Sequence, residues 1–371
     1  MMSKLSSIEH QASSIRHQAS SIKHQASSIK HQASSIKHQT PLFLPVFEYG
    51  NSYVTIEQLE NQFDVTALIT NAYFLYKKRE LKLAVTEQNV KNFLGFGGLV
   101  VTDSGAFQQF SGPLYLSNKK IIKFQRDIGA DVISPLDIIT TPGDNRTTAT
   151  KKLNATLKRI REGMALADPA ILIGVQQGGR FHDLRGYALE KLMEMGVKYI
   201  ALGSLVPFFN RNHDIEFIGK VIQQARKIID PDIPIHLYGG GDPLELPFYI
   251  FMGCDIFDSS SFIHYARGGW YMTPYGAFDV QRNTPASLPR TCECSLCKTD
   301  RKEVWENEKK LALHNLWTIQ DVIREMRMII GRGNRLSEYL NHVTAIHQEC
   351  FPESRLAGSW ERLCNNYRDF T

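Results

Sequence analysis

The chain has 371 residues, of which 43% are hydrophobic and 22% charged, and its formal net charge at pH 7 is +5. This composition suits a protein with a large core, and one α/β barrel would use most of the length. No apolar run is long enough to span a bilayer, and the first residues lack a secretion signal, so we expect a cytoplasmic protein without a membrane partner. Five basic side chains and one acidic one lie in the first forty residues. The rest of the chain is therefore nearly neutral, and its charge does not by itself indicate nucleic-acid binding.

Residues 1–40 contain five near-identical copies of a heptapeptide of the form SIKHQAS. An Ile followed four residues later by an Ala, repeated every seven residues, could form the seam of a coiled coil. Ala is a weak core residue, however, and two Ser per heptad disfavour a helix. We therefore expect a flexible or loosely helical tail without a catalytic role.

From residue 41 onward, short apolar segments rich in β-formers alternate with helical segments. The eight apolar segments are 41–47, 65–74, 98–103, 131–137, 170–177, 197–205, 233–238 and 254–258. The helical segments include 117–129, 145–166, 182–195, 213–229, 243–252 and 303–330. This alternation predicts an α/β fold with a parallel sheet, and eight such units close into a (β/α)8 TIM barrel. An open doubly wound sheet is the alternative, but the glycines at 239–241 lack the spacing of a dinucleotide fingerprint.

Polar residues stand where the predicted strands end. Asp103, Asp137 and Asp258 close three of these strands, and Gln177 closes a fourth. Because the carboxyl ends of barrel strands converge on one mouth, these side chains should ring one pocket. A single aspartate would more simply cap the next helix. Three carboxylates with an amide predict a functional site.

Three cysteines lie within six positions of one another, and a histidine follows them. They are Cys292, Cys294 and Cys297, with His314 after sixteen intervening residues. In a chain expected in the cytoplasm, this crowding indicates a metal rather than disulfides. Three thiolates and an imidazole form a closed tetrahedral site, which predicts one structural zinc per chain.

The ordered motifs of the body resemble those of the tRNA-guanine transglycosylase family, and its archaeal branch most closely. They are TDSGAFQ at 102–108, FQRDIGAD at 124–131, VQQGGRFHDLR at 175–185, ALGSLVP at 201–207, HLYGGGDP at 236–243, DIFDSSSF at 255–262, YARGGWYMTP at 265–274, CECSLC at 292–297 and LALHNLW at 311–317. The resemblance covers about residues 41–330. It implies a zinc-bearing (β/α)8 barrel and a pentosyltransferase that exchanges a guanine in tRNA for a 7-deazaguanine, with 7-cyano-7-deazaguanine as the expected base.

The resemblance also assigns catalytic roles. Asp258 matches the family's nucleophile, which attacks C1′ of the ribose and forms a covalent aspartyl-ribose intermediate. Asp103 matches the proposed general acid and base. Asp137 matches the carboxylate that recognises the guanine-like edge, where its hydrogen bonds are charge-assisted.

Four further residues are expected to bind the base. Gln177 and the backbone of Ser204 and Leu205 would meet its carbonyl side, and Phe107 would offer a stacking face. The target base must leave its stack to reach this pocket.

Some positions depart from the family's pattern. Ser204 stands where a second Gly is common, and Asp242 stands where the archaeal branch usually has His. About forty residues follow the zinc helix, which is too few for the RNA-binding domains of archaeal enzymes. DNA is therefore an alternative substrate, and a non-catalytic partner subunit is a further, weaker one. The family also implies a homodimer, by analogy only.

These features predict four regions. Residues 1–40 form the repeat tail, and 41–285 form the transglycosylase barrel. Residues 286–330 form a zinc-binding subdomain, and 331–371 form a helical C-terminal extension.

Overall fold

The computed structural model describes residues 35–37, 39–50, 53–111, 116–283, 292–333 and 336–368. Most of the predicted repeat tail, residues 1–34, lies outside the described residues. None of the helices in the described part combines the length and apolar character that a membrane span requires.

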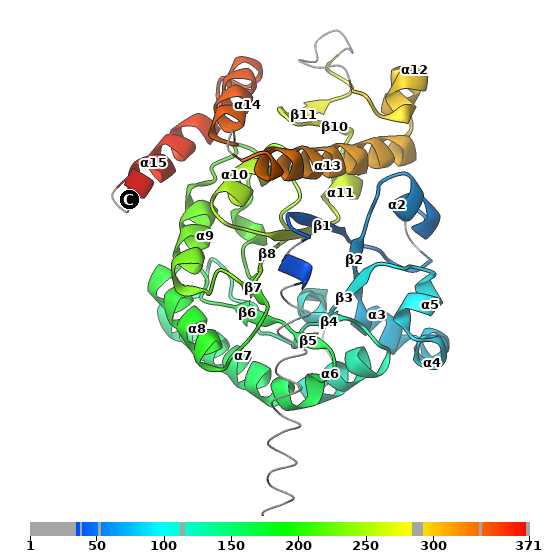
Figure 1. The fold of residues 1–371 in the computed structure, drawn as a ribbon, viewed down its shortest axis with the longest axis vertical. Coiled ribbons are helices and arrows are strands. Elements are labelled where there is room, and N and C mark those ends of the chain that lie inside the picture. Colours follow the sequence, from blue (N-terminus) through cyan, green and yellow to red (C-terminus); the bar gives the residue numbers. More distant parts are fainter. Residues whose placement is uncertain are drawn as a thin grey trace, which may run out of the picture.

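The barrel predicted from the eight apolar segments is confirmed (Figure 1). Each segment contains a strand, and the fifth is split in two by Ile173. The strands are β1 (Leu42–Pro45), β2 (Ala67–Asn71), β3 (Leu99–Asp103), β4 (Val132–Ile133), β5 (Ile171–Leu172), β6 (Gly174–Gln176), β7 (Ile200–Leu202), β8 (Ile235–Tyr238) and β9 (Ile256–Ser259). All neighbouring pairs among them are parallel.

Two sheets share these strands and together form the ring. One has the order β1-β9-β8-β7-β6, and the other has the order β2-β3-β4-β5. A parallel bridge between Val46 and Ile69 joins β1 to β2. The chain itself joins β5 to β6 through Ile173, whose amide bonds to the carbonyl of Ile133 at 2.9 Å. All eight strand positions are therefore linked in a circle.

Helices surround the ring and connect successive strands (Figure 1). They are α2 (Ile56–Asn61), α3 (Ala72–Lys77), α4 (Arg79–Gln88), α5 (Val90–Leu94), α6 (Asn118–Asp127), α7 (Arg146–Ala167), α8 (His182–Glu194), α9 (Glu216–Ile228), α10 (Leu246–Phe251) and α11 (Ser261–Arg267), with 3-10 turns at Ala106–Ser111 and Val206–Phe208. Five of these ten helices, α2, α3, α5, α6 and α7, begin at side-chain caps. At the start of α7, for example, Asn145 Oδ1 accepts from the Thr148 amide.

The core has two apolar clusters, as expected for a barrel. One fills the space between the strands and the outer helices. The other fills the barrel interior with side chains such as Leu44, Val101, Val175 and Ile256. Ile36 belongs to this interior cluster and is only 5% exposed, so the barrel packing begins before residue 41.

A second group of elements lies to one side of the ring (Figure 1). An antiparallel hairpin, β10 (Trp270–Thr273) and β11 (Gly276–Asp279), is followed by α12 (Ser295–Glu306) and the long α13 (Glu308–Gly331). Helix α13 packs against α11, β1 and β10, which fixes the hairpin to the barrel. Two further helices follow, α14 (Leu336–Cys350) and α15 (Leu356–Arg368).

Candidate active site

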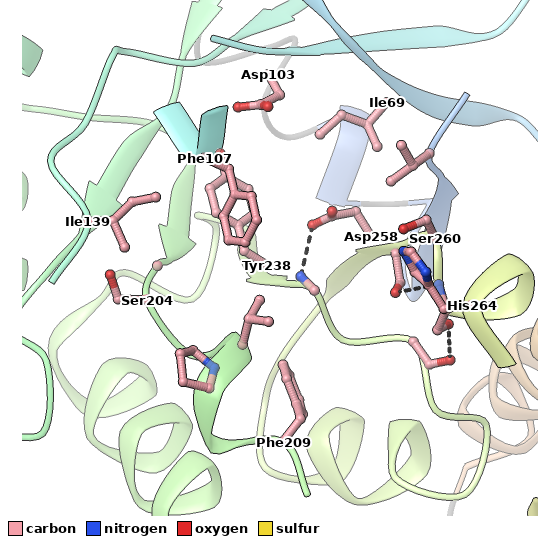
Figure 2. Close-up of a pocket in the computed structure, with 18 of the residues that line it drawn as sticks. Ile69, Asp103, Phe107, Ile139, Ser204, Phe209, Tyr238, Asp258, Ser260 and His264 are labelled. Atoms are coloured by element: carbon pink, nitrogen blue, oxygen red, sulfur yellow. Dashed lines mark hydrogen bonds between the residues drawn. The ribbon is translucent and has the colours of Figure 1, made fainter. Parts of the chain in front are cut away.

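The three strand-end aspartates line one cavity of about 600 Å³ at the carboxyl ends of the strands. Asp103 is the last residue of β3, Asp258 lies in β9, and Asp137 follows β4. Figure 2 shows Asp103 and Asp258 on different walls of this cavity. The strand geometry therefore brings together carboxylates that are far apart in the sequence.

Asp103 sits in a polar corner of the cavity. The side-chain amide of Asn71, at the end of the neighbouring β2, donates to Asp103 Oδ2 at 2.9 Å. The same amide donates to Gln108 at 3.2 Å. Burial is the main cause that raises the pKa of Asp103 to about 7, and the charges of Asp137 and Asp258 add to it. At neutral pH, this carboxyl therefore exists in comparable amounts with and without its proton.

Asp137 is buried beside an amide that favours its charged form. The Nε2 of Gln177 donates to Asp137 Oδ2 at 2.6 Å. Burial raises the pKa of Asp137 to about 6, while the Gln177 hydrogen bond and the charge of Arg159 limit the increase. Above pH 6, Asp137 is thus mainly an acceptor.

A network of side chains fixes the Gln177 amide. Its Oε1 accepts from Thr140 Oγ1 at 2.8 Å and from Ser204 Oγ at 2.5 Å. Ser204 has a φ of 58°, a region that favours glycine, and its hydroxyl also accepts from the Thr140 amide at 3.0 Å. Ser204 therefore combines an unusual backbone conformation with two polar contacts at the cavity wall.

The predicted base-binding residues occupy different positions relative to the cavity. Ser204 and Phe107 line it, and the Phe107 side chain is 57% exposed there (Figure 2). Gln177 and Leu205 are buried and do not line it. Gln177 therefore influences the cavity by donating a hydrogen bond to Asp137, which does line it. The expected contact of the base with the Leu205 backbone stays a prediction.

Asp258 receives its contacts from the adjacent strand β8 and the loop after it. The amide of Gly239 donates to Asp258 Oδ1 at 3.3 Å (Figure 2), and His236 Nε2 lies 2.9 Å from the same oxygen. Gly241 packs so closely that a Cβ there would lie 2.3 Å from the Cβ of Ser259. The glycine at this position lets the loop approach the strand that carries Asp258.

The cavity extends beyond the aspartates to a second polar region. Arg211, Asp242, Glu245 and Tyr265 line this part. His213 lies behind it, with Nδ1 2.8 Å from Glu245 Oε1. Burial lowers the pKa of His213, but the hydrogen bond to Glu245 and the charge of Asp242 outweigh this effect and raise it to about 9. The two carboxylates are therefore held beside a histidine cation.

The predicted metal ligands are brought together on the side of the barrel. The Sγ atoms of Cys292, Cys294 and Cys297 lie 3.5, 3.6 and 3.5 Å from His314 Nδ1. A tetrahedral zinc with ordinary Zn–S and Zn–N bonds would separate such atoms by about 3.6 Å. This Cys3His cluster can therefore hold a metal ion of that size.

Neighbouring groups orient the cluster. The other ring nitrogen of His314, Nε2, lies 2.9 Å from the carbonyl oxygen of Met272 in β10. A proton on Nε2 satisfies that carbonyl and leaves Nδ1 as the ligand atom. The ring of Tyr271 stacks on His314 at 3.8 Å, and its hydroxyl lies 3.3 Å from Cys297 Sγ. The cluster thus ties β10, α12 and α13 together.

Comparison with known proteins assigns this chain to a family. The family model described as queuine tRNA-ribosyltransferase matches residues 25–349. The chain belongs to this family. It is accordingly a pentosyltransferase, and the resemblance inferred from the motifs is confirmed.

The similar relatives include three archaeal proteins, each named tRNA-guanine(15) transglycosylase. The one from Methanopyrus kandleri is 34% identical over 88% of this chain and 72% of its own length. The one from Pyrococcus abyssi is 33% identical over 88% of this chain and 55% of its own length. The one from Nanoarchaeum equitans is 34% identical over 81% of this chain and 70% of its own length. The chain thus spans between about half and three quarters of these relatives.

The sequence interpretation missed several residues of the site. Asn71 ends β2 as Asp103 ends β3, so the strand-end pattern could have identified it. Thr140 and His236 gave no such signal, because their importance depends on which side chains they meet in space.

Proposed function

We propose that this chain is a base-exchange transglycosylase that replaces guanine in tRNA with a 7-deazaguanine. The observation that carries the proposal is that Asp103, Asp137 and Asp258 share one cavity but differ in environment. Asp103 has a pKa near neutrality, Asp137 is held by an amide donor, and Asp258 is held by a backbone amide. These environments suit three different tasks in one reaction.

The first step is an attack by the carboxylate of Asp258 on C1′ of the target ribose. A C1′–O bond forms as the glycosidic C1′–N9 bond breaks, and the bond's electron pair leaves with guanine. Asp103 in its protonated form delivers the proton that neutralises the leaving base. Its pKa of about 7 makes this form available at neutral pH.

The second step reverses the first with a different base. The incoming 7-deazaguanine loses its N9 proton to the carboxylate of Asp103, which the first step left without a proton. N9 then attacks C1′, and the aspartyl ester breaks, so the electron pair returns to Asp258. Two displacements at one carbon regenerate the enzyme with its protons balanced.

Asp137 selects the base. Its ionised carboxylate accepts hydrogen bonds from the ring N–H and the exocyclic amine of a guanine-like edge. Adenine does not offer this pair of adjacent donors, because the ring nitrogen beside its amine carries no proton. Gln177 holds the carboxylate in place. The exposed ring of Phe107 offers a stacking face to the base.

The Cys3His cluster is proposed to hold one structural zinc per chain. All four ligand positions come from the protein, so the zinc fixes the hairpin and helices to the barrel and takes no part in base exchange.

The polymer substrate is proposed to be tRNA, which is the substrate in the names of the similar relatives. Such a reaction belongs in the cytoplasm. The homodimer implied by the family is a further proposal, and sedimentation analysis would test it.

Incorporation of labelled 7-cyano-7-deazaguanine into tRNA or duplex DNA tests the proposal. We expect label in tRNA, with unlabelled guanine released in equal amount. Label in DNA alone would contradict the choice of polymer. The absence of label in both would contradict the enzymatic proposal and favour a binding subunit.

A further inference from the structure

A chain of buried polar groups lies among the apolar side chains of the barrel interior and reaches Asp258. Tyr199 and His236 are both completely buried. The Tyr199 hydroxyl lies 3.0 Å from His236 Nδ1, and His236 Nε2 lies 2.9 Å from Asp258 Oδ1. Neither residue lines the cavity. Because burying polar side chains is energetically costly, we expect both to have a role in the contact with Asp258.

The strand register explains how these groups meet. In the pairing of β8 with β9, His236 stands opposite Ile256, and Tyr238 stands opposite Asp258. Side chains two residues apart on a strand point to the same face, so His236 and Asp258 both face the barrel interior. Tyr199 precedes β7 and packs in the same interior cluster as Ile36.

The position of the protons follows from these contacts. A bare lone pair on Nε2 would be repelled by the carboxylate 2.9 Å away, so Nε2 carries a proton. Burial raises the pKa of Tyr199 far above its ordinary value, so its hydroxyl keeps its proton and donates to Nδ1. The Tyr199 hydroxyl thereby selects the histidine tautomer that presents an N–H to Asp258.

The contact between Nε2 and Asp258 is short but not well aligned as a hydrogen bond. Hydrogen bonds of catalytic groups commonly align only when the substrate is bound. Both of the donors around Asp258, Nε2 and the Gly239 amide, approach Oδ1. Within the described part of the chain, no hydrogen bond reaches Oδ2.

We propose that Tyr199 and His236 form a positioning pair that holds Asp258 Oδ1 and leaves Oδ2 as the atom that attacks C1′. This inference rests on the proposed transglycosylase reaction. In the intermediate, Oδ2 is the ester oxygen and Oδ1 is the carbonyl oxygen. When the C1′–Oδ2 bond breaks, negative charge returns to both oxygens, and the His236 N–H stabilises the share on Oδ1.

Three substitutions test the pair. Tyr199→Phe removes only the hydroxyl, His236→Leu removes the donor to Asp258, and His236→Gln restores an N–H donor near the position of Nε2. Ser359→Ala is the matched control, because it removes a buried, hydrogen-bonded hydroxyl in α15, outside the barrel interior. Melting temperatures establish that each variant is folded.

The readouts are the single-turnover rate of covalent adduct formation and the KM for the incoming base. We expect His236→Leu to slow adduct formation about 100-fold, as removal of one catalytic donor commonly does. Tyr199→Phe should slow it about tenfold, and His236→Gln should recover at least tenfold over His236→Leu. The KM for the base should stay within about twofold of the wild-type value.

Wild-type adduct rates in folded Tyr199→Phe and His236→Gln, with a loss in His236→Leu no larger than in Ser359→Ala, would overturn the positioning pair alone. Losses confined to KM would also overturn it. The absence of an adduct in the wild-type protein would instead overturn the proposed function on which the pair rests.

Discussion

Asp103 and Asp137 have raised pKa values for the same main reason, burial, but their neighbours give them different tasks. Asp103 faces two other carboxylates, whose charges raise its pKa further, to about 7. Asp137 receives a short hydrogen bond from Gln177 and the field of Arg159, and its pKa stays near 6. A group poised at neutrality suits proton transfer, and a group that is mainly ionised suits base recognition.

The raised pKa of Asp103 predicts that this carboxyl is needed for activity but lowers the stability of the fold. The folded state binds the proton of the Asp103 carboxyl more tightly than the unfolded state does. The free energy of unfolding therefore decreases as the pH rises from about 4 to about 7. Asp103→Asn removes this penalty and should raise the melting temperature at pH 8 by roughly 2–4 °C. The gain should shrink toward zero at pH 4, while turnover is lost at every pH. A variant less stable than the wild type at pH 8 would contradict this account.

Asp137 predicts a pH dependence of base affinity. Protonation removes an acceptor from the recognition edge, so affinity should fall as the pH drops below about 6. Asp137→Asn should raise the KM for the base at least about tenfold at pH 7.5, the range expected for a lost charged hydrogen bond. Equilibrium binding between pH 5 and 8 checks both effects. An unchanged KM, or a variant that keeps the wild-type pH dependence, would show that another group recognises the base.

At the scale of elements, alternation of apolar and helical segments predicted the barrel, since each of the eight apolar segments contains a strand. The break at Ile173 and the short helices α2 to α5 were not predicted, because they depend on local packing rather than on a long periodic pattern. The strand-end rule identified Asp103, Asp137 and Asp258. It could not identify Tyr199 and His236, because inward-facing side chains meet only through the register of neighbouring strands.

The metal cluster predicts that a bound zinc stabilises the packing of β10, α12 and α13. Cys294→Ser should reduce the bound zinc to well below one per chain and lower the free energy of unfolding by at least about 3 kcal/mol. Cys350→Ser, which changes a partly exposed thiol of α14, is the control and should have little effect. Elemental analysis and denaturant unfolding measure the two quantities. Full stability in a zinc-free Cys294→Ser protein would remove the structural role.

At the scale of the whole molecule, the last copy of the heptapeptide belongs to the barrel. The Ile36 side chain enters the interior cluster, and the amine of Lys37 pairs with Asp255, which also pairs with Arg226 at 2.7 Å. Figure 1 shows this short helical turn within the ring of strands. The proposed boundary at residue 41 stays a prediction, as do those at 286 and 331, but packing links residues 36 and 37 to the barrel.

This packing predicts that Ile36 matters for stability. Ile36→Ala should lower the free energy of unfolding by about 2–4 kcal/mol, because it leaves a cavity in the barrel interior. Ile330→Ala, at a position 48% exposed on α13, should change it by less than about 0.5 kcal/mol. Denaturant unfolding of both variants gives the comparison. Equal effects in the two variants would mean that Ile36 does not pack in the barrel interior in solution.

The most direct test of base exchange at Asp258 is the mass of the denatured protein after incubation with tRNA in the absence of an incoming base. We expect a covalent protein–RNA adduct that maps to Asp258 after digestion and is absent from a folded Asp258→Asn variant. An adduct that persists in Asp258→Asn, or that maps to Asp103, would contradict it.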